Sequence, residues 1–125
     1  MSAKSPEEIC SLFRQHMAEG DIEALLDLYD SDAVFLDQSG EIKKGRPGLR
    51  ESLVPMALAK AKFDFRIKQM IPAGDIVLMH TEWKTSAPQP MYVYAIEVAR
   101  RQPDGGWCWL IGDPFTVGRP TLPMP

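Results

Sequence analysis

Hydrophobic residues follow two different spacings along the chain. In the first half they recur every three or four positions, as on one side of an amphipathic helix. This spacing predicts three helices, whose apolar stripes are Ile9, Leu12, Phe13 and Met17, then Ile22, Leu25, Leu26 and Tyr29, then Leu49, Leu53 and Met56. From residue 63 onward apolar and polar residues alternate, which predicts β-strands.

The ends of the helices carry recognisable signals. Ser5 can cap the first helix, and Glu8 completes a capping box with it. Gly20 can end that helix in the left-handed conformation, and Asp21 can then cap the second, so we expect almost no loop between them. Pro55 is expected to kink or end the third helix, because proline cannot donate the backbone hydrogen bond of a helix interior.

A short strand over residues 33–37 lies between the second and third helices, and a hairpin turn follows it. Successive strand side chains point to opposite faces, so Phe35 and Asp37 should share one face. If that face lines a closed cavity, desolvation raises the proton affinity of Asp37, which suits a general base. If it faces water, Asp37 caps the hairpin through backbone amides.

Four longer strands are expected at residues 63–71, 76–85, 91–101 and 107–113. We assign Val77, Met79, Thr81 and Trp83 to the interior and His80 and Glu82 to the outside. In the last strand, Asp113 is predicted to share a face with Trp107 and Trp109. The strand over residues 91–101 is largely apolar on both faces, which favours a homodimer that covers its outer face.

The overall composition limits the classes of function. A chain of 125 residues suits one domain, here residues 1–116, followed by a proline-rich tail at 117–125. A net charge of −3 argues against a nucleic-acid partner, and no apolar run is long enough to cross a membrane. Cys10 and Cys108 show no metal-ligand spacing, so we expect reduced thiols, a cytoplasmic location, and no metal or other cofactor.

The segment LYDSDAVFLD and the order of elements around it resemble the opening of the NTF2-like superfamily, in particular its ketosteroid isomerase and SnoaL-like branches. The resemblance covers about residues 6–115. It implies an α+β fold of the NTF2-like or cystatin-like kind. In that fold, three N-terminal helices pack into a strongly bent antiparallel sheet, which forms a cone with a pocket inside.

The same resemblance assigns roles to individual positions. Asp37 falls on the family's catalytic base, and Glu97 falls near its protonated aspartate. The two tyrosines of the family's oxyanion site fall on Phe13 and near Leu53, which carry no hydroxyl. Their absence argues against steroid isomerisation itself, because removing one preorganised donor costs on the order of a hundredfold in rate.

The candidate site therefore combines acids with an aromatic lining. The candidate catalytic residues are Asp37, Glu97 and Asp113, and the candidate ligand-binding residues are Phe13, Tyr29, Phe35, Trp83 and Trp109. Alternatives stay open: Tyr29 suits the core as well as a pocket, and Glu97 can be paired with Arg100 or Lys84. Three functions fit this pattern, namely proton transfer next to the carbonyl of a small hydrophobic compound, ligand binding without catalysis, and dimeric assembly.

Overall fold

The computed structural model describes residues 3–87 and 89–118, and it shows an α+β fold with one mixed sheet. The elements are α1 (Pro6–Glu19), α2 (Ile22–Leu26), β1 (Tyr29–Leu36), β2 (Ile42–Lys44), α3 (Gly45–Leu58), β3 (Lys62–Ala73), β4 (Ile76–Ala87), β5 (Met91–Arg101) and β6 (Trp107–Asp113). The six strands lie in the order β2-β1-β6-β5-β4-β3. Most of the predicted tail, from residue 119, lies outside the described residues.

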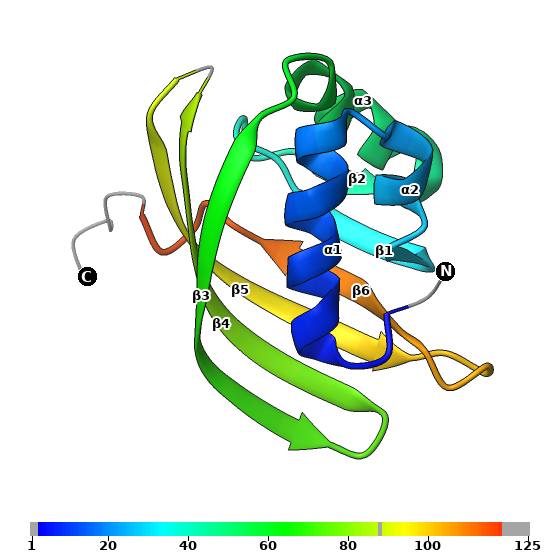
Figure 1. Ribbon diagram of the computed structural model, residues 1–125. Helices are drawn as coiled ribbons and strands as arrows, with labels where there is room; N and C mark the ends of the chain where they lie inside the picture. The colour runs from blue at the N-terminus through cyan, green and yellow to red at the C-terminus, as the bar shows by residue number, and fades with distance from the viewer. Residues whose placement is uncertain (1–2, 88, 119–125) are drawn as a thin grey trace.

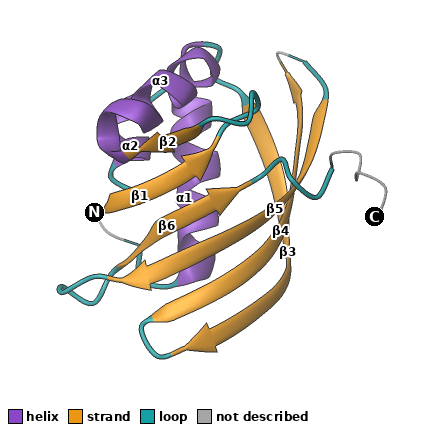
Figure 2. Ribbon diagram, turned by 180° about the vertical axis from the view of Figure 1, so that it is seen from behind, coloured by secondary structure: helices purple, strands orange, loops and turns teal. Residues whose placement is uncertain are grey.

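The sheet curves around α1, while α2 and α3 lie beside that helix over β1 and β2 (Figure 1). Seen from behind, the sheet turns an outer face toward the viewer, and no helix of the described chain covers that face (Figure 2). The predicted cone of helices in a bent sheet is thus confirmed. One pairing is not antiparallel, because β1 runs parallel to β6. No helix of the described residues is long and apolar enough to span a membrane.

The predicted helix boundaries are largely confirmed. The backbone N–H of Glu8 donates to the Ser5 hydroxyl oxygen at 3.2 Å. Gly20 adopts a left-handed φ of 71°, and the Asp21 carboxylate caps Ala24. The second helix has only 5 residues, however, so the expectation that Tyr29 lies on it is wrong. Tyr29 instead begins β1, where it is paired with Trp109 of β6.

Pro55 does not end the third helix. The helix α3 continues past Pro55 to Leu58. A proline removes one helix hydrogen bond and crowds the carbonyl four residues before it, so it disturbs the preceding turn while the residues after it can stay helical. Leu49, Leu53 and Ala57 form its buried side, close to the predicted stripe.

Irregular pairing changes the faces of two strands. In β3, the register skips Lys68, so Met70 joins the inner face and Ile71 points outward with 54% of its surface exposed. In β6, the register of pairing with β5 skips Leu110, so Gly112 pairs with the inner residue Glu97. An extra residue in one strand shifts every later side chain to the other face. The prediction that Asp113 shares a face with the tryptophans is therefore wrong.

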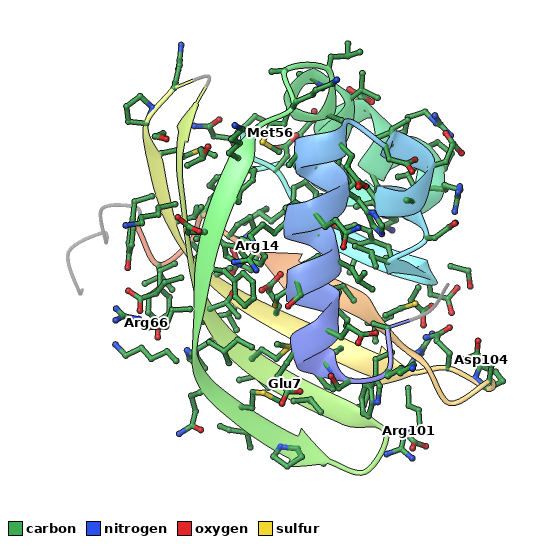
Figure 3. The ribbon with its side chains drawn as sticks, viewed as in Figure 1. Glu7, Arg14, Met56, Arg66, Arg101 and Asp104 are labelled. Carbon is green, nitrogen blue, oxygen red and sulfur yellow. The ribbon has the colours of Figure 1, made fainter. Side chains whose placement is uncertain are left out.

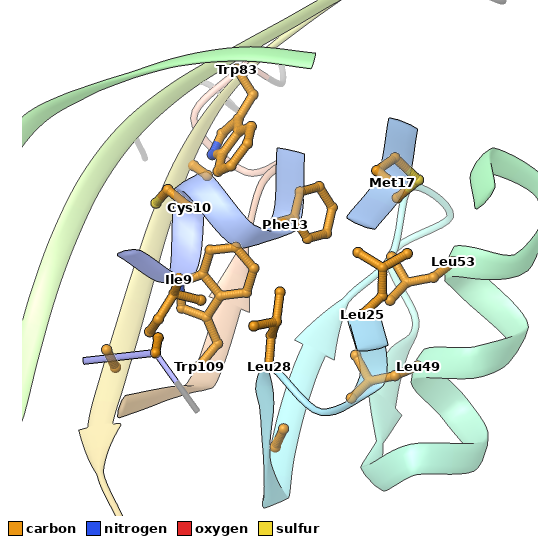
Figure 4. Packing of buried hydrophobic residues seen from close by; sticks show 14 of the residues in the cluster. Ile9, Cys10, Phe13, Met17, Leu25, Leu28, Leu49, Leu53, Trp83 and Trp109 are labelled. Atoms are coloured by element: carbon orange, nitrogen blue, oxygen red, sulfur yellow. The ribbon is translucent and has the colours of Figure 1, made fainter. Parts of the chain in front are cut away.

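A continuous core lies between α1, α2, α3 and the inner side of the sheet (Figure 4). Ile9, Met17, Leu25 and Leu28 are almost completely buried there. Trp107 lies near the edge of this core, where its backbone N–H donates to Ala3 and its ring packs under the guanidinium of Arg101. Trp107 therefore does not line the cavity described below, to which Trp83 and Trp109 both contribute.

Charged and aromatic side chains alternate on the outer face of the sheet, as predicted for His80 and Glu82. Glu82 accepts hydrogen bonds from Arg66 and from the Tyr92 hydroxyl, and His80 contacts the Tyr94 hydroxyl. In Figure 3, Arg66 projects away from α1, whereas Arg14 extends from α1 toward the sheet, where its guanidinium covers Phe65. The outer face is thus held together by contacts between neighbouring strands.

Candidate functional site

A cavity of about 450 Å³ lies between α1, α3 and the inner side of the sheet. Its wall is mostly apolar and includes all five aromatic residues predicted to bind a ligand, which are Phe13, Tyr29, Phe35, Trp83 and Trp109. For Tyr29, this position supports the pocket alternative. A volume of this size matches the range of small-molecule sites in proteins.

The aromatic rings form a connected cluster around Phe13. The ring centroid of Phe13 lies 5.3 Å from that of Trp83 and 5.4 Å from that of Trp109, both edge-to-face (Figure 4). Tyr29 packs against Trp109 at 5.4 Å. Edge-to-face pairs at these distances are favourable, so the cavity wall has a defined shape.

Glu97 is the acid that the fold carries into this wall. It lies on the inner face of β5, only 8% exposed, and it forms no ion pair with any described residue. The alternative in which Glu97 pairs with Arg100 is wrong, because Arg100 binds Asp30 and Asp32 instead. Burial raises the pKa of Glu97 to about 7, although hydrogen bonding that involves Thr81 and Trp83 opposes that rise.

Two buried side chains fix one oxygen of Glu97. The Thr81 hydroxyl donates to Glu97 Oε1 at 2.5 Å, and the Trp83 indole N–H donates to Thr81 Oγ1 at 2.9 Å. Thr81 was predicted to be inside, but sequence reasoning gave it no role at the site. The signal that could have indicated this contact is that Thr81 occupies an inner position of β4 and Glu97 an inner position of the neighbouring β5.

One further donor is left without a partner in the part of the chain that the structure describes. Trp109 Nε1 is a buried nitrogen with no hydrogen-bond acceptor. Burial and the nearby Glu97 raise the pKa of Tyr29, so its phenol stays protonated at neutral pH. Unsatisfied polar groups are rare in native interiors, and water or a ligand commonly satisfies them.

Asp37 lies where β1 ends and lines the outer part of the cavity, on the same side as Phe35, as predicted. Its Oδ1 accepts hydrogen bonds from the Ser39 hydroxyl and from the amides of Ser39 and Glu41 at 2.6, 2.9 and 2.9 Å. These bonds, the Ser39 hydroxyl first, hold the pKa of Asp37 below its usual value. Of the two alternatives for Asp37, the one in which desolvation raises its pKa is wrong, and the hairpin-capping one describes Oδ1 correctly.

Asp113 is not brought into the site. Beyond the irregularity in β6 it is on the outer side of the sheet, and it does not line the cavity. Its Oδ1 accepts from the Thr116 hydroxyl at 2.7 Å and from the Thr116 amide at 3.2 Å. Asp113 therefore stabilises the turn after β6.

Lys43 and Glu51 also line the outer part of the cavity, and sequence reasoning missed both. Lys43 Nζ lies 2.9 Å from Glu41, 3.2 Å from Glu51 and 4.0 Å from Asp37. These residues come from the β1–β2 hairpin and α3, and no sequence motif links them. The rim of the cavity is thus charged, while its depth is aromatic.

The described residues contain no cluster of three or more His, Cys, Asp or Glu side chains that could hold a metal ion. Cys10 and Cys108 are both buried and unbridged. Burial raises the pKa of both thiols, that of Cys108 to about 11. They are therefore protonated at neutral pH and poor nucleophiles.

Comparison with known proteins places this geometry in a family. A model of the SnoaL-like domain matches residues 11–109. No curated protein matches the sequence.

Solved structures share the fold over most of their length. One from Parabacteroides distasonis, named as a candidate ketosteroid isomerase, is 29% identical with a TM-score of 0.68, over 86% of this chain and 83% of that one. One from Thiobacillus denitrificans, named as a candidate calcium/calmodulin-dependent protein kinase type II association domain, has a TM-score of 0.76 at 16% identity, over 93% of this chain and 99% of that one. One from Streptomyces avermitilis, named as a candidate dehydratase of the NTF2-like family, has a TM-score of 0.64 at 17% identity, over 83% of this chain and 87% of that one. The chain belongs to the SnoaL-like domain family of the NTF2-like superfamily.

Proposed function

We propose that the cavity binds a small, mostly apolar carbonyl compound, and that Glu97 donates a hydrogen bond to its carbonyl oxygen. The observation that carries this proposal is a buried acid, with a pKa of about 7, in an aromatic wall. Near neutral pH a large fraction of such an acid is protonated and can donate. A carbonyl oxygen is an acceptor that suits this donor and needs no charge in the buried part of the ligand.

The reaction that fits is proton transfer next to that carbonyl. Asp37 takes a proton from the adjacent carbon, the electron pair moves toward the oxygen as an enolate, and Glu97 stabilises the new charge by its hydrogen bond. Return of the proton to a different carbon gives isomerisation, and loss of a leaving group gives elimination. The names of two structural neighbours, an isomerase and a dehydratase, are consistent with this class of chemistry.

The rate of such a reaction is expected to be modest. Hydrogen bonds keep Asp37 ionised but also make it a weaker base, because its pKa lies below the usual value. Phe13 and Leu53 supply no phenol at the cavity wall. Glu97 is the donor on which the proposed reaction relies.

The test is hydrogen–deuterium exchange at the carbon next to the carbonyl in a panel of cyclic ketones and enones, followed by NMR in deuterated buffer. We expect exchange that falls by at least about tenfold in both variants, since Asp37→Asn removes the base and Glu97→Gln replaces the acid O–H by a weaker amide donor. Both variants keep the size of the native side chain. Unchanged exchange in Asp37→Asn would remove Asp37 as the base, and unchanged exchange in Glu97→Gln would show that the acid proton of Glu97 is not needed.

A second candidate function is binding without catalysis. It is favoured by the three hydrogen bonds on Asp37 Oδ1, which suit a structural cap better than a base. The same ketone panel separates the two functions, because a bound compound raises the melting temperature whether or not it reacts. Stabilisation of the protein with no isotope exchange would favour the binding function.

We also propose that the chain forms a homodimer through the outer face of the sheet. Three large apolar residues are exposed there, namely Tyr92 at 62%, Ile71 at 54% and Ile111 at 42%. Exposed apolar patches on a sheet are frequent sites of association. This surface supports the assembly alternative without excluding a working cavity on the opposite side.

A further inference from the structure

The hydrogen bonds around Glu97 have a fixed direction. An indole N–H can only donate, so Thr81 Oγ1 is the acceptor in its 2.9 Å contact with Trp83. The Thr81 hydroxyl has one hydrogen left to donate, and Glu97 Oε1 lies 2.5 Å away. The order is therefore Trp83 to Thr81 to Glu97, and each donor in it is accounted for.

The alternative direction is unfavourable. If Glu97 Oε1 carried the acid proton and donated it to Thr81, the threonine hydroxyl would need another acceptor for its own hydrogen. Thr81 is 0% exposed, and its hydroxyl has no other hydrogen-bond partner among residues 3–87 and 89–118. A buried hydroxyl hydrogen without an acceptor is costly, so this arrangement is disfavoured.

We infer that Thr81 and Trp83 are positioning residues that make Oε1 of Glu97 the carbonyl oxygen and so place the acid proton on Oε2. The inner face of β5 turns Glu97 toward the cavity, and the anchored Oε1 limits the rotation of its carboxyl group. Oε2 is then the oxygen that can donate to a ligand. This last step rests on the proposed function, whereas the position of the proton does not.

Other titratable groups near Glu97 do not compete for this proton. Tyr29 of β1 and Cys10 of α1 are both electrostatically coupled to Glu97. Burial, the larger cause, and the charge of Glu97 raise the pKa of each of them. Both are therefore neutral near pH 7 and change charge only far above the range in which Glu97 titrates.

Infrared difference spectroscopy of the free protein tests the position of the proton. At pH 5.5–6, most other carboxyl groups are ionised and Glu97 is protonated, and subtraction of the Glu97→Gln spectrum identifies its carboxylic C=O band. In Thr81→Val we expect this band at higher frequency, because the C=O oxygen has lost its hydrogen bond. Thr81→Ser keeps the hydroxyl and should leave the band near its native position.

A band that does not move in Thr81→Val would overturn the inference, since the proton would then lie on Oε1. A band shifted equally in Thr81→Ser would also overturn it, because the hydroxyl would be irrelevant. NMR titration of the ¹³C-labelled carboxyl adds a second readout, with the Glu97 pKa expected to rise from about 7 to about 8 in Thr81→Val.

Trp83→Phe tests the outer link and does not depend on how Thr81→Val folds. It keeps an aromatic ring in the wall but removes the indole N–H, so we expect a smaller rise in the same pKa and a detectable change in the C=O band. No change in either would remove Trp83 from the arrangement. If 2-cyclohexenone fails to perturb the band in a protein that otherwise behaves as expected, only the proposed function is contradicted.

Discussion

Ala95 and Ala99 lie on the same inner face of β5, two residues before and two residues after Glu97. Of these two alanines, only Ala95 borders the cavity. Both are buried, at 2% and 0% exposure. Ala99 is surrounded by the packed core, whereas the space in front of Ala95 is open. The same substitution should therefore have opposite consequences at the two positions.

We expect Ala95→Leu to fold with nearly native stability and to lose ligand binding, because the added atoms fill part of the cavity. Ala99→Leu should cost about 1–3 kcal/mol in the free energy of unfolding, since a packed core must move to accept it. Urea denaturation measures both stabilities, and thermal shift with the ketone panel measures binding. Equal destabilisation by the two substitutions would show that the space beside Ala95 is closed.

Glu97 should make stability depend on pH. Its pKa rises from 4.5 to about 7 on folding, so the folded state keeps a proton that the unfolded state loses in this range. The stabilising contribution is full below pH 4.5 and is lost as the pH rises through 7. We expect the stability of the native chain, relative to Glu97→Gln, to fall by about 3 kcal/mol between these limits. Parallel urea titrations at pH 4.5 and pH 8 measure it, and a constant difference between the two proteins would contradict the buried acid.

Asp30 of β1 should be important for stability. Its two oxygens accept hydrogen bonds from Arg100 at 2.8 and 2.9 Å, from Gln102 at 2.8 Å and from the Asp32 amide at 2.8 Å. We expect Asp30→Ala to lower the free energy of unfolding by about 2 kcal/mol, because several partly buried donors lose their acceptor. Asp32→Ala is the matched control, since the exposed Asp32 side chain makes only one contact with Arg100, and it should change stability little.

The contribution of the Asp30 carboxylate to stability should change in acid. Burial opposes its ionisation, but the hydrogen bonds from Arg100, Asp32 and Gln102 outweigh that effect and lower the pKa of Asp30 below 3.8. The contribution of Asp30 is therefore present above pH 3.8 and is lost as the pH falls through its lower folded value. The stability difference between the native protein and Asp30→Ala should shrink below that pH, and a difference that grew there would contradict the assignment.

The proposed homodimer can be tested by sedimentation equilibrium. We expect the native chain to sediment at twice its mass and Ile111→Lys, on the outer face, to sediment as a monomer, because a buried lysine is costly at an apolar interface. Leu58→Lys is the control, since Leu58 is 80% exposed at the end of α3, away from the sheet face. A monomeric native protein would contradict the dimer, as would equal dissociation by both substitutions.

The sequence alone predicted the elements whose signals are local. The Ser5 and Gly20 boundaries of α1 follow from backbone chemistry within a few residues, and the alternation of β4 correctly separated Thr81 and Trp83 from the outer face. It also predicted an aromatic cavity, because the inward positions of several elements carry large rings.

Only the tertiary structure decided which acid is desolvated. Alternation assigns a face only while strand pairing stays regular, and the extra residue at Leu110 moved Asp113 out of the site. The pKa of a carboxyl group depends on every element around it, so Asp37, hydrogen-bonded at the hairpin, and Glu97, enclosed beneath α1, were shifted in opposite directions. Burial and hydrogen bonding are sums over distant parts of the chain, and no local pattern contains them.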